Sequence, residues 1–437
     1  MRSLVARLTP AVLVAWIVLA ALVPRLSPLR PVYLVNTYLL LPALFGAALL
    51  DCVLRSRRRW ALRVRVSDAG LALFGLVAVA SIALQHDPGA VVRQNLADLW
   101  RTFVVPVAAF WAIRLTRPRE KGLASWAVPL AALCAIELAV GLLAWLDPPA
   151  LPSFWPGSIQ ETGGVRITGT LPQPDLYAAV MVFCATTLAN LGAGAASRLT
   201  RSLAGGGIAL AFTGVFLSFS RASWLGGLLA LAILVANYGR KLAVPCVVIV
   251  LAVVGLSRVH EGTARLPASG PATAAPAREN ESYATTRLTM TWTIRDRIVL
   301  DVAGLKMFLR RPLLGWGFGS YDRHAHEFVA KVGPFVPTEW DKNEAASHCT
   351  HLSILAEMGV LGYGLLALPA ARLVGAMVHR RKTLWRDRPL VGLWAIAIFL
   401  AVVSLLVDLR YVALSLGLGG LVLGLIAVRV DADEPER

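Results

Sequence analysis

The side chains best suited to chemistry gather in one polar, cationic stretch of an otherwise apolar chain, between about Arg258 and Cys349. A neutral histidine in this stretch could accept a proton near neutral pH, as a general base must. Arginines beside apolar spans commonly meet anionic lipid or phosphate. We therefore expect the chemistry of the chain here, among these side chains: Arg287, Arg297, Arg310, Arg311, Lys342 and His348.

Two further arginines lie outside this stretch, at the ends of apolar runs. Arg221 occupies a turn of only a few residues, and Arg166 precedes the run that begins near 175. An arginine at a membrane edge can equally be an anchor whose side chain reaches the headgroups. For His348 the corresponding alternative is a polar residue at a helix start, so position alone assigns no role to these three residues.

Three other patterns favour a structural explanation. The glycines of Gly315–Gly319 lack the Lys-Ser/Thr of a P-loop, so we expect a tight turn there. His324 and His326 have no carboxylate or thiol cluster to complete a metal site, so we expect surface histidines and no metal. Asp431, with an aspartate two residues later, is expected in a terminal tail.

The composition identifies a membrane protein. Of 437 residues 57% are hydrophobic and 16% charged, which excludes a typical soluble domain. The net charge of +17 is distributed around apolar spans and accompanies no nucleic-acid motif, so we expect membrane lipids and no nucleic acid as partners. Four of the five cysteines lie inside apolar runs, and Cys349 has no disulfide or metal partner in the pattern.

Apolar runs of roughly 17–25 residues predict about twelve spans. Connections rich in Lys and Arg alternate with poorer ones, which by the positive-inside rule places both termini in the cytoplasm. We expect the first run to be a retained helix and not a signal peptide. The spans lie near 10–26, 32–54, 68–84, 97–114, 123–146, 175–194, 203–218, 221–238, 242–257, 350–377, 389–407 and 411–429.

This pattern divides the chain into nine spans in 1–257, a large outer loop in 258–349, and three spans with a cytoplasmic tail in 350–437. The alternation also places 85–96, 147–174 and the Arg221 turn on the outer face. Inside the large loop, Ile298, Val302, Leu305 and Leu309 follow helical spacing, which predicts an amphipathic helix on or near the spans. Pro312 and the glycines after it end this helix.

Taken together, these pieces resemble the O-antigen ligase and polymerase superfamily of bacterial inner membranes. The resemblance covers roughly residues 160–365, and the motif order and membrane sidedness agree with it. It rests on Arg166-Ile-Thr-Gly169 with Pro174; on Ser218-Phe-Ser-Arg221-Ala-Ser-Trp224; on Arg297 with the helix before Arg311-Pro-Leu-Leu-Gly-Trp-Gly-Phe-Gly319; and on His348-x-x-x-Leu352-x-x-x-x-Glu357-x-Gly359-x-x-Gly362. The superfamily pattern usually has Asn at the positions of Cys349 and Asp175, so it assigns no role to those two residues.

The resemblance implies an all-α, polytopic, GT-C-like glycosyltransferase with a large helical periplasmic loop and no cofactor. The donor would be a glycan on undecaprenyl pyrophosphate, and the acceptor of a ligase would be the outer core sugar of lipid A-core. Arg221 and Arg297 would bind the pyrophosphate. His348 would deprotonate or orient the acceptor hydroxyl for a direct, inverting displacement that needs no metal.

Alternatives remain open at this point. An O-antigen polymerase or a protein O-oligosaccharyltransferase would keep the chemistry and change the acceptor. A lipid-linked glycan transporter is a more distant possibility, which predicts paired broken helices and charged residues at mid-bilayer. Arg166, Arg287 and Lys342 are further candidates for contacts to substrate.

Overall fold

The chain is an all-α polytopic membrane protein, and the described residues add one small β-hairpin to the helices. Its backbone hydrogen bonds are satisfied within each helix, which is what a bilayer demands of a spanning segment. The computed structural model describes residues 4–23, 30–55, 66–85, 87–117, 127–146, 151, 155–161, 164–195, 197–239, 248–249, 292–329, 347–381, 385–411 and 413–432.

The first elements form long apolar helices, two of which contain a π-helical segment. These π-helical segments contact each other, since Trp100 Nε1 donates to the carbonyl of Tyr38 at 3.0 Å. The elements are α1 (Leu4–Leu22), α2 (Arg30–Leu34), η1 (Val35–Leu39), α3 (Leu40–Arg55), α4 (Val66–Leu84), α5 (Gly89–Leu99), η2 (Trp100–Val104) and α6 (Val105–Thr116).

The middle of the described chain carries the hairpin between two helices. Its strands pair antiparallel, with Ile159 opposite Arg166. The elements are α7 (Ala127–Leu146), β1 (Gly157–Glu161), β2 (Gly164–Gly169), α8 (Pro174–Gly194), α9 (Arg198–Leu217) and α10 (Arg221–Tyr238). The hairpin lies within the predicted outer segment 147–174, for which the sequence analysis predicts no strands.

The last elements include two helices of the predicted large loop. They are α13 (Trp292–Arg310), α14 (Tyr321–Val329), α15 (Thr350–His379), α17 (Arg388–Leu406), η7 (Leu409–Tyr411) and α18 (Ala413–Ala432). The loop helix predicted from Arg297 to Leu309 is therefore present as α13.

Ten helices in the described residues are long and apolar enough to cross a membrane. Each coincides with a predicted span. Asp68–Leu84 is apolar but shorter, and it matches the third predicted span. The predicted span at 242–257 lies outside the described residues, except for 248–249.

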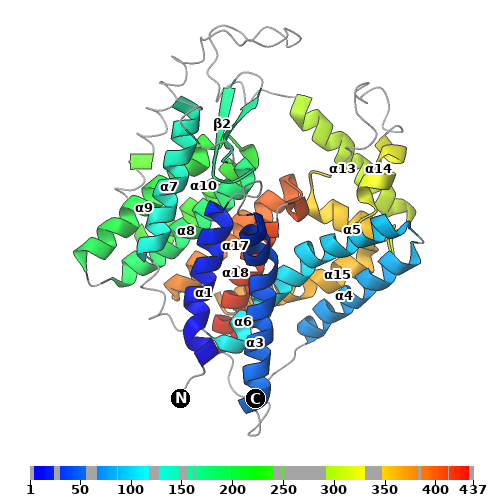
Figure 1. The fold of residues 1–437 in the computed structure, drawn as a ribbon, viewed down its shortest axis with the longest axis horizontal. Helices are drawn as coiled ribbons and strands as arrows, with labels where there is room; N and C mark the ends of the chain where they lie inside the picture. Colours follow the sequence, from blue (N-terminus) through cyan, green and yellow to red (C-terminus); the bar gives the residue numbers. More distant parts are fainter. Residues whose placement is uncertain are drawn as a thin grey trace.

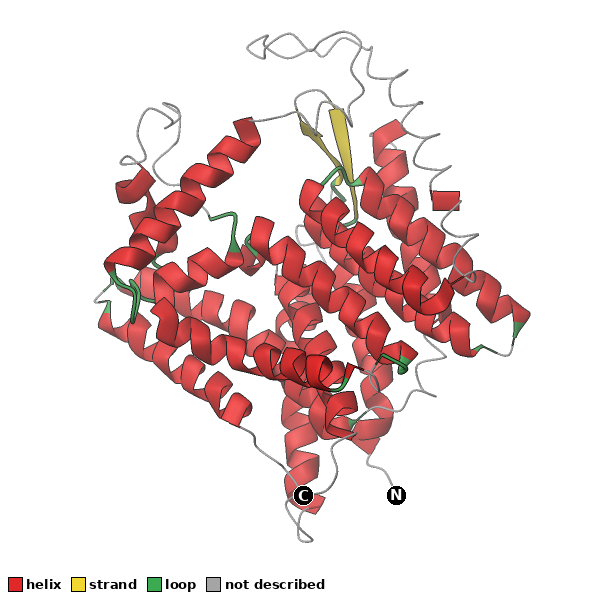
Figure 2. Cartoon of the chain, turned by 180° about the vertical axis from the view of Figure 1, so that it is seen from behind, coloured by secondary structure: helices red, strands yellow, loops and turns green. Residues whose placement is uncertain are grey.

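The helices form a central group flanked by a group on each side (Figure 1). The central group contains α1, α3, α6, α17 and α18, the first flank contains α7 to α10, and the second contains α4, α5 and α15. The hairpin and α13 stand at one end, which we call the hairpin end, and Figure 2 shows the same arrangement from behind. The opposite end, where α1 begins and α18 ends, is called the termini end.

α13 packs through a different face from the one that the sequence pattern indicates. Its buried residues are Val299, Leu300, Ala303 and Met307, which form a small core with α14 and with Ala356 of α15. The predicted stripe of Ile298, Leu305 and Leu309 is exposed. The helix is apolar on two faces, and spacing alone does not indicate which of them contacts protein.

α15 is broken at Gly359, whose φ of 62° and ψ of −172° lie in a region essentially restricted to glycine. The loop after α13 fills the break. Trp316 N–H donates to the Ala356 carbonyl at 3.0 Å, and Gly317 N–H donates to the Glu357 carbonyl at 2.7 Å. A Cβ on Gly359 would lie 2.3 Å from the Leu313 carbonyl oxygen. The motif glycines thus allow loop and broken helix to approach closely.

Candidate active site

The turn before Arg221 is held by a buried serine cluster at the hairpin end. Ser220 caps α10, with its Oγ accepting from Ser223 N at 3.3 Å. Asp175, at the start of α8, accepts from the hydroxyls of Ser220 and, at 3.0 Å, of Ser223. These bonds connect two helix starts and fix where Arg221 leaves the turn. Asp175 therefore has a structural role where the superfamily usually has Asn.

Arg166 reaches the same turn from the hairpin. Its Nε donates to the Ser218 carbonyl at 3.0 Å, and its side chain is half-buried. The structure therefore brings Arg166 and Arg221 together, although 55 positions separate them in the chain. Arg166 braces the turn, which gives it a positioning role even where it contacts no substrate.

Arg297 lies in the first part of α13 and reaches the end of α17. Its Nη1 donates to the Leu406 carbonyl at 3.1 Å. One turn later, burial raises the pKa of Asp301 to about 6, and the charge of Arg297 partly opposes this shift. Asp301 Oδ1 is buried and has no hydrogen-bond partner among the described residues.

His348 sits two residues before α15 and is half-buried. Its pKa lies below the usual range, chiefly because burial disfavours the charged ring and also because Arg297 is near. The charges of Asp408 and Asp175 act in the opposite direction. His348 is therefore electrostatically coupled both to Arg297 and to the acid that holds the Arg221 turn. A ring with a lowered pKa is neutral at pH 7 and able to take up a proton.

His351, the other histidine at this helix start, is occupied differently. Its Nδ1 lies 2.9 Å from the Tyr363 hydroxyl, and its Nε2 lies 2.9 Å from Ser404 Oγ. Both ring nitrogens therefore bind within the helix bundle, which leaves neither for a substrate. Of these two histidines, His348 is the one suited to act as a base.

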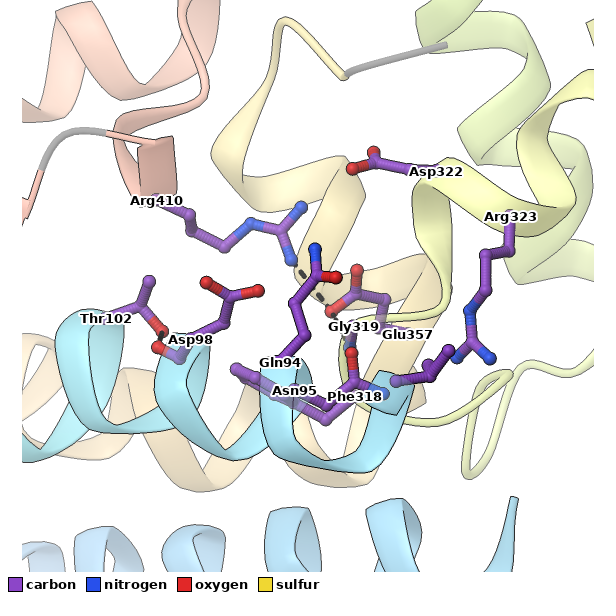
Figure 3. Close-up of a pocket in the computed structure, with 11 residues that line it drawn as sticks. Gln94, Asn95, Asp98, Thr102, Phe318, Gly319, Asp322, Arg323, Glu357 and Arg410 are labelled. Carbon is purple, nitrogen blue, oxygen red and sulfur yellow. Dashed lines mark hydrogen bonds and ion pairs between the residues drawn. The ribbon is translucent and has the colours of Figure 1, made fainter. Parts of the chain in front are cut away.

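A charged cluster that the sequence analysis missed lies beside His348, and we call Glu357, Asp408 and Arg410 the hairpin-end cluster. Arg410 Nη1 donates to Glu357 Oε2 at 2.7 Å, and Arg410 Nη2 donates to Asp408 Oδ2 at 2.8 Å. Both carboxylates are only 2% exposed. The two carboxylates share one guanidinium, and Figure 3 shows Arg410 reaching across to Glu357. The available signal was an Asp-Leu-Arg between two predicted spans.

The cluster also fastens the loop after α13. Glu357 accepts from the backbone N–H groups of Gly319 at 3.0 Å and Tyr321 at 3.2 Å, so it holds the start of α14. Asp408 accepts from Ser353 Oγ at 2.7 Å. The motif residue Glu357 is thus a positioning residue for α14 and for Arg410.

Two predicted contacts, Arg287 and Lys342, lie outside the described residues. Arg311 lies over the Trp316 ring, with its guanidinium carbon 4.1 Å from the centroid, and so stabilises the glycine turn. His324 stacks on the same ring at 4.8 Å. Within the described residues, no group of three or more His, Cys, Asp or Glu side chains lies close enough together to hold a metal ion.

Residues 206–367 match the family model described as O-Antigen ligase. The matched segment contains Arg221, Arg297, His348 and the break in α15, and it ends before Asp408 and Arg410. A search of curated proteins gave no match.

Proposed function

We propose that the chain, whose residues 206–367 match the O-antigen ligase family model, is an O-antigen ligase of the O-antigen ligase/polymerase superfamily. It would transfer a polysaccharide from undecaprenyl pyrophosphate to the outer core sugar of lipid A-core. The observation that carries this proposal is that Arg297 and Thr350, two residues after His348, donate to the adjacent carbonyls of Leu406 and Val407 at 3.1 and 3.0 Å. Two motifs that are distant in sequence therefore meet at the end of α17, and the lowered pKa of His348, to which Arg297 contributes, agrees with this.

Arg221 and Arg297 bind the pyrophosphate of the donor in this proposal. The leaving group gains negative charge as the bond from the anomeric carbon to the phosphate oxygen breaks. Arginine suits this task because its planar fork donates two hydrogen bonds to phosphate oxygens and stays charged. Preorganised donors of this kind stabilise developing charge without reorganisation. Asp175 and the serine cluster hold Arg221 in place, and the Leu406 carbonyl holds Arg297.

His348 acts as the general base. The acceptor hydroxyl attacks the anomeric carbon, its proton passes to the neutral imidazole, and the lipid pyrophosphate leaves from the opposite face. A single displacement of this kind inverts the anomeric centre. Asp408 stabilises the imidazolium that forms, because its charge favours the protonated ring. The proton is later released to solvent.

The hairpin end faces the periplasm in this proposal, and both termini lie in the cytoplasm of a bacterial inner membrane. Support comes from the described arginines at the termini end, which the positive-inside rule associates with the cytoplasm. They are Arg114, which binds Asp431; Arg380, whose Nη1 donates to the Val430 carbonyl; and Arg388, which follows Asp387, the partner of Arg429. A periplasmic site requires a donor that is already activated, which a glycan on a lipid pyrophosphate provides.

The decisive experiment is reconstitution of the purified chain in vesicles with lipid-linked glycan and lipid A-core, without nucleotide or divalent metal. Transfer of glycan to the core supports the ligase. Lengthening of the lipid-linked glycan indicates a polymerase, and transfer to an added acceptor protein indicates an oligosaccharyltransferase. Movement of the donor across the bilayer without transfer indicates a transporter. Transfer that stops with chelator would contradict the metal-free mechanism.

Single substitutions test the site in the same assay. Arg221→Ala and Arg297→Ala should each lower transfer by roughly 10²–10³-fold, the usual loss for one charge-stabilising group. Arg201→Ala is the matched control, because Arg201 is an exposed arginine at the start of α9. Full transfer by both site variants at normal membrane abundance would reject the assignment.

A further inference from the structure

A cavity of about 290 Å³ lies between the hairpin-end cluster and α5, and most of the side chains that line it are polar. Glu357 and Arg410 form one wall, Gln94, Asn95 and Asp98 of α5 form another, and Phe318 with the adjacent glycine closes it. Gln94 and Asp98 project from α5 toward Arg410 and Glu357 (Figure 3). Its volume lies just below the ~300–1,000 Å³ typical of ligand pockets, which suits a small ligand.

The charges that line the cavity disfavour a phosphate ligand. Three carboxylates face two guanidinium groups across it, and both arginines are engaged by acids. Arg410 pairs with Glu357, and Arg323 Nη1 lies 2.5 Å from Asp87 Oδ1. Asp98, another of the lining acids, is paired with Arg101. An anion would therefore find both lining guanidinium groups already engaged by acids, whereas hydroxyl groups can donate to the carboxylates.

One wall residue carries a hydrogen-bonding group with no partner. Asn95 is 3% exposed, and its Nδ2 makes no hydrogen bond within the described part of the chain. A buried amide donor left unpaired costs free energy. Gly319 permits its close approach, because a Cβ there would lie 2.5 Å from Asn95 Oδ1. Asn95 thus lines the cavity with a donor that is covered in this conformation, so its contact with a ligand oxygen requires a rotation of the side chain.

The cavity is connected to the candidate base by charged contacts. Arg410 bonds to Glu357 at the cavity wall and to Asp408, and Asp408 in turn acts on the pKa of His348. A ligand in the cavity is therefore separated from His348, the proposed general base, by the ion pair of Arg410 and Asp408. Carboxylates, amides, a hydroxyl and one aromatic ring are the side chains that bind sugar hydroxyls and the apolar face of a sugar ring.

We propose that this cavity is a sugar-binding subsite, which holds an uncharged sugar of the acceptor or of the donor beside the reaction centre. The proposal rests on the glycosyltransferase function above and names a part of its substrate site. Gln94, Asn95 and Asp98 make the contacts to sugar hydroxyls, and Phe318 packs on the ring. Arg410 is a positioning residue that links the subsite to Asp408 and His348.

Direct binding tests the proposal without requiring catalysis. The full chain in nanodiscs is titrated calorimetrically with two soluble probes, the delipidated core oligosaccharide and the delipidated glycan of the lipid-linked donor. We expect one of them to bind, and Asn95→Leu and Gln94→Ala each to weaken it roughly three- to tenfold, the loss expected for one hydrogen bond. Gln94 is exposed, so its variant folds even if Asn95→Leu does not. Asn237→Ala is the control away from the cavity; this half-buried amide near the end of α10 donates to the Arg388 carbonyl at 3.1 Å.

Kinetics in reconstituted vesicles identify the source of the sugar. A higher KM for lipid A-core with an unchanged KM for the donor identifies an acceptor sugar, and the reverse identifies a donor sugar. Binding of neither probe to the unmodified protein overturns the subsite, as does equal affinity in both variants. Displacement of the bound probe by inorganic pyrophosphate also overturns it. His348→Ala should lower transfer by roughly 10²–10⁴-fold and retain binding, so failure of the transferase function can be distinguished from failure of the subsite.

Discussion

Two clusters of charged side chains lie at opposite ends of α15 and α18, and their balance of charge differs. The termini-end cluster consists of two acids and two arginines, which are Asp68, Asp431, Arg114 and Arg372. Arg114 binds Asp68 at 2.6 Å and Asp431 at 3.2 Å, and Arg372 binds Asp431 at 2.5 Å. Asp431 is therefore a helix clamp, which corrects the expectation that it lies in a terminal tail.

At the hairpin end, Glu357 and Asp408 share Arg410, and a cavity adjoins them. His348 and Arg297 are coupled to the same region. A balanced cluster connects helices and has no charge left for a ligand, whereas an unbalanced cluster beside a cavity can respond to a ligand or to a proton. In this protein, a buried charged cluster therefore indicates function where its acids and arginines are unequal in number.

The largest expected effect is that of replacing His348. It tests whether glycan transfer depends on the hairpin end and not on the termini end. His348→Ala should lower kcat for glycan transfer by roughly 10²–10⁴-fold, the usual contribution of a general base. The measurement is transfer in reconstituted vesicles at saturating donor and acceptor. His379→Ala is the control, because His379 is the exposed last residue of the same helix, at the termini end. Equal loss in both variants would contradict the division between the ends.

The next largest effect is expected from replacing the arginine of the hairpin-end cluster, and it is compared with the replacement of one arginine of the termini-end cluster. Arg410→Gln leaves two buried carboxylates without their shared partner, so transfer should fall about 10- to 100-fold and the free energy of unfolding by about 3–5 kcal/mol. In Arg372→Gln, Arg114 still pairs with Asp431, so the loss should be at most about 1 kcal/mol with unchanged transfer. Thermal unfolding in nanodiscs and the transfer assay provide the two measurements. Equal effects of the two substitutions would remove the distinction between the clusters.

Much of the fold is predictable from the sequence because a bilayer imposes simple rules. Long apolar runs predicted every helix that is described as long enough to span. The turn at Gly315–Gly319 is confirmed, with all three glycines at positive φ. The hairpin was missed although β-branched residues alternate around it, at Ile159, Val165 and Ile167.

The candidate site was only partly predictable, because its contacts span long distances in sequence. Arg410 and Glu357 are 53 positions apart, and no spacing rule pairs them. The sequence does not predict the break in α15 either, since nothing distinguishes Gly359 from the other small residues of an apolar helix. A broken helix is a feature that the transporter alternative predicts, but here the loop at 312–317 occupies the break. The roles of Arg221, Arg297 and His348 stay predictions.

A smaller effect concerns the break that shapes the hairpin-end cluster. Gly359→Ala places a Cβ against the Leu313 carbonyl in a conformation that suits only glycine, so it should cost about 1–3 kcal/mol and lower transfer several-fold. Gly364→Ala on the same helix is the control, because a Cβ there meets nothing within 4 Å. It should be neutral or stabilise by up to about 1 kcal/mol. Thermal unfolding measures both, and an unaffected Gly359→Ala variant would show that the loop does not depend on the break.

The smallest effect is a shift in pH dependence, and it tests the coupling between the cluster and the base. Neutral His348 is the active form, and its pKa is lowered by burial and by Arg297, so kcat/KM should stay high as the pH falls below the ordinary histidine value of 6.5. The charge of Asp408 raises that pKa, so Asp408→Asn should lower it further and move the acid limb to lower pH. The position of the limb is read from the profile of kcat/KM, independently of its height, which falls because Arg410 loses a partner.

Asp431→Asn in the termini-end cluster is the control, and it should leave the acid limb unmoved. An acid limb that moves to higher pH in Asp408→Asn, or that moves equally in Asp431→Asn, would show that the hairpin-end cluster does not act on His348.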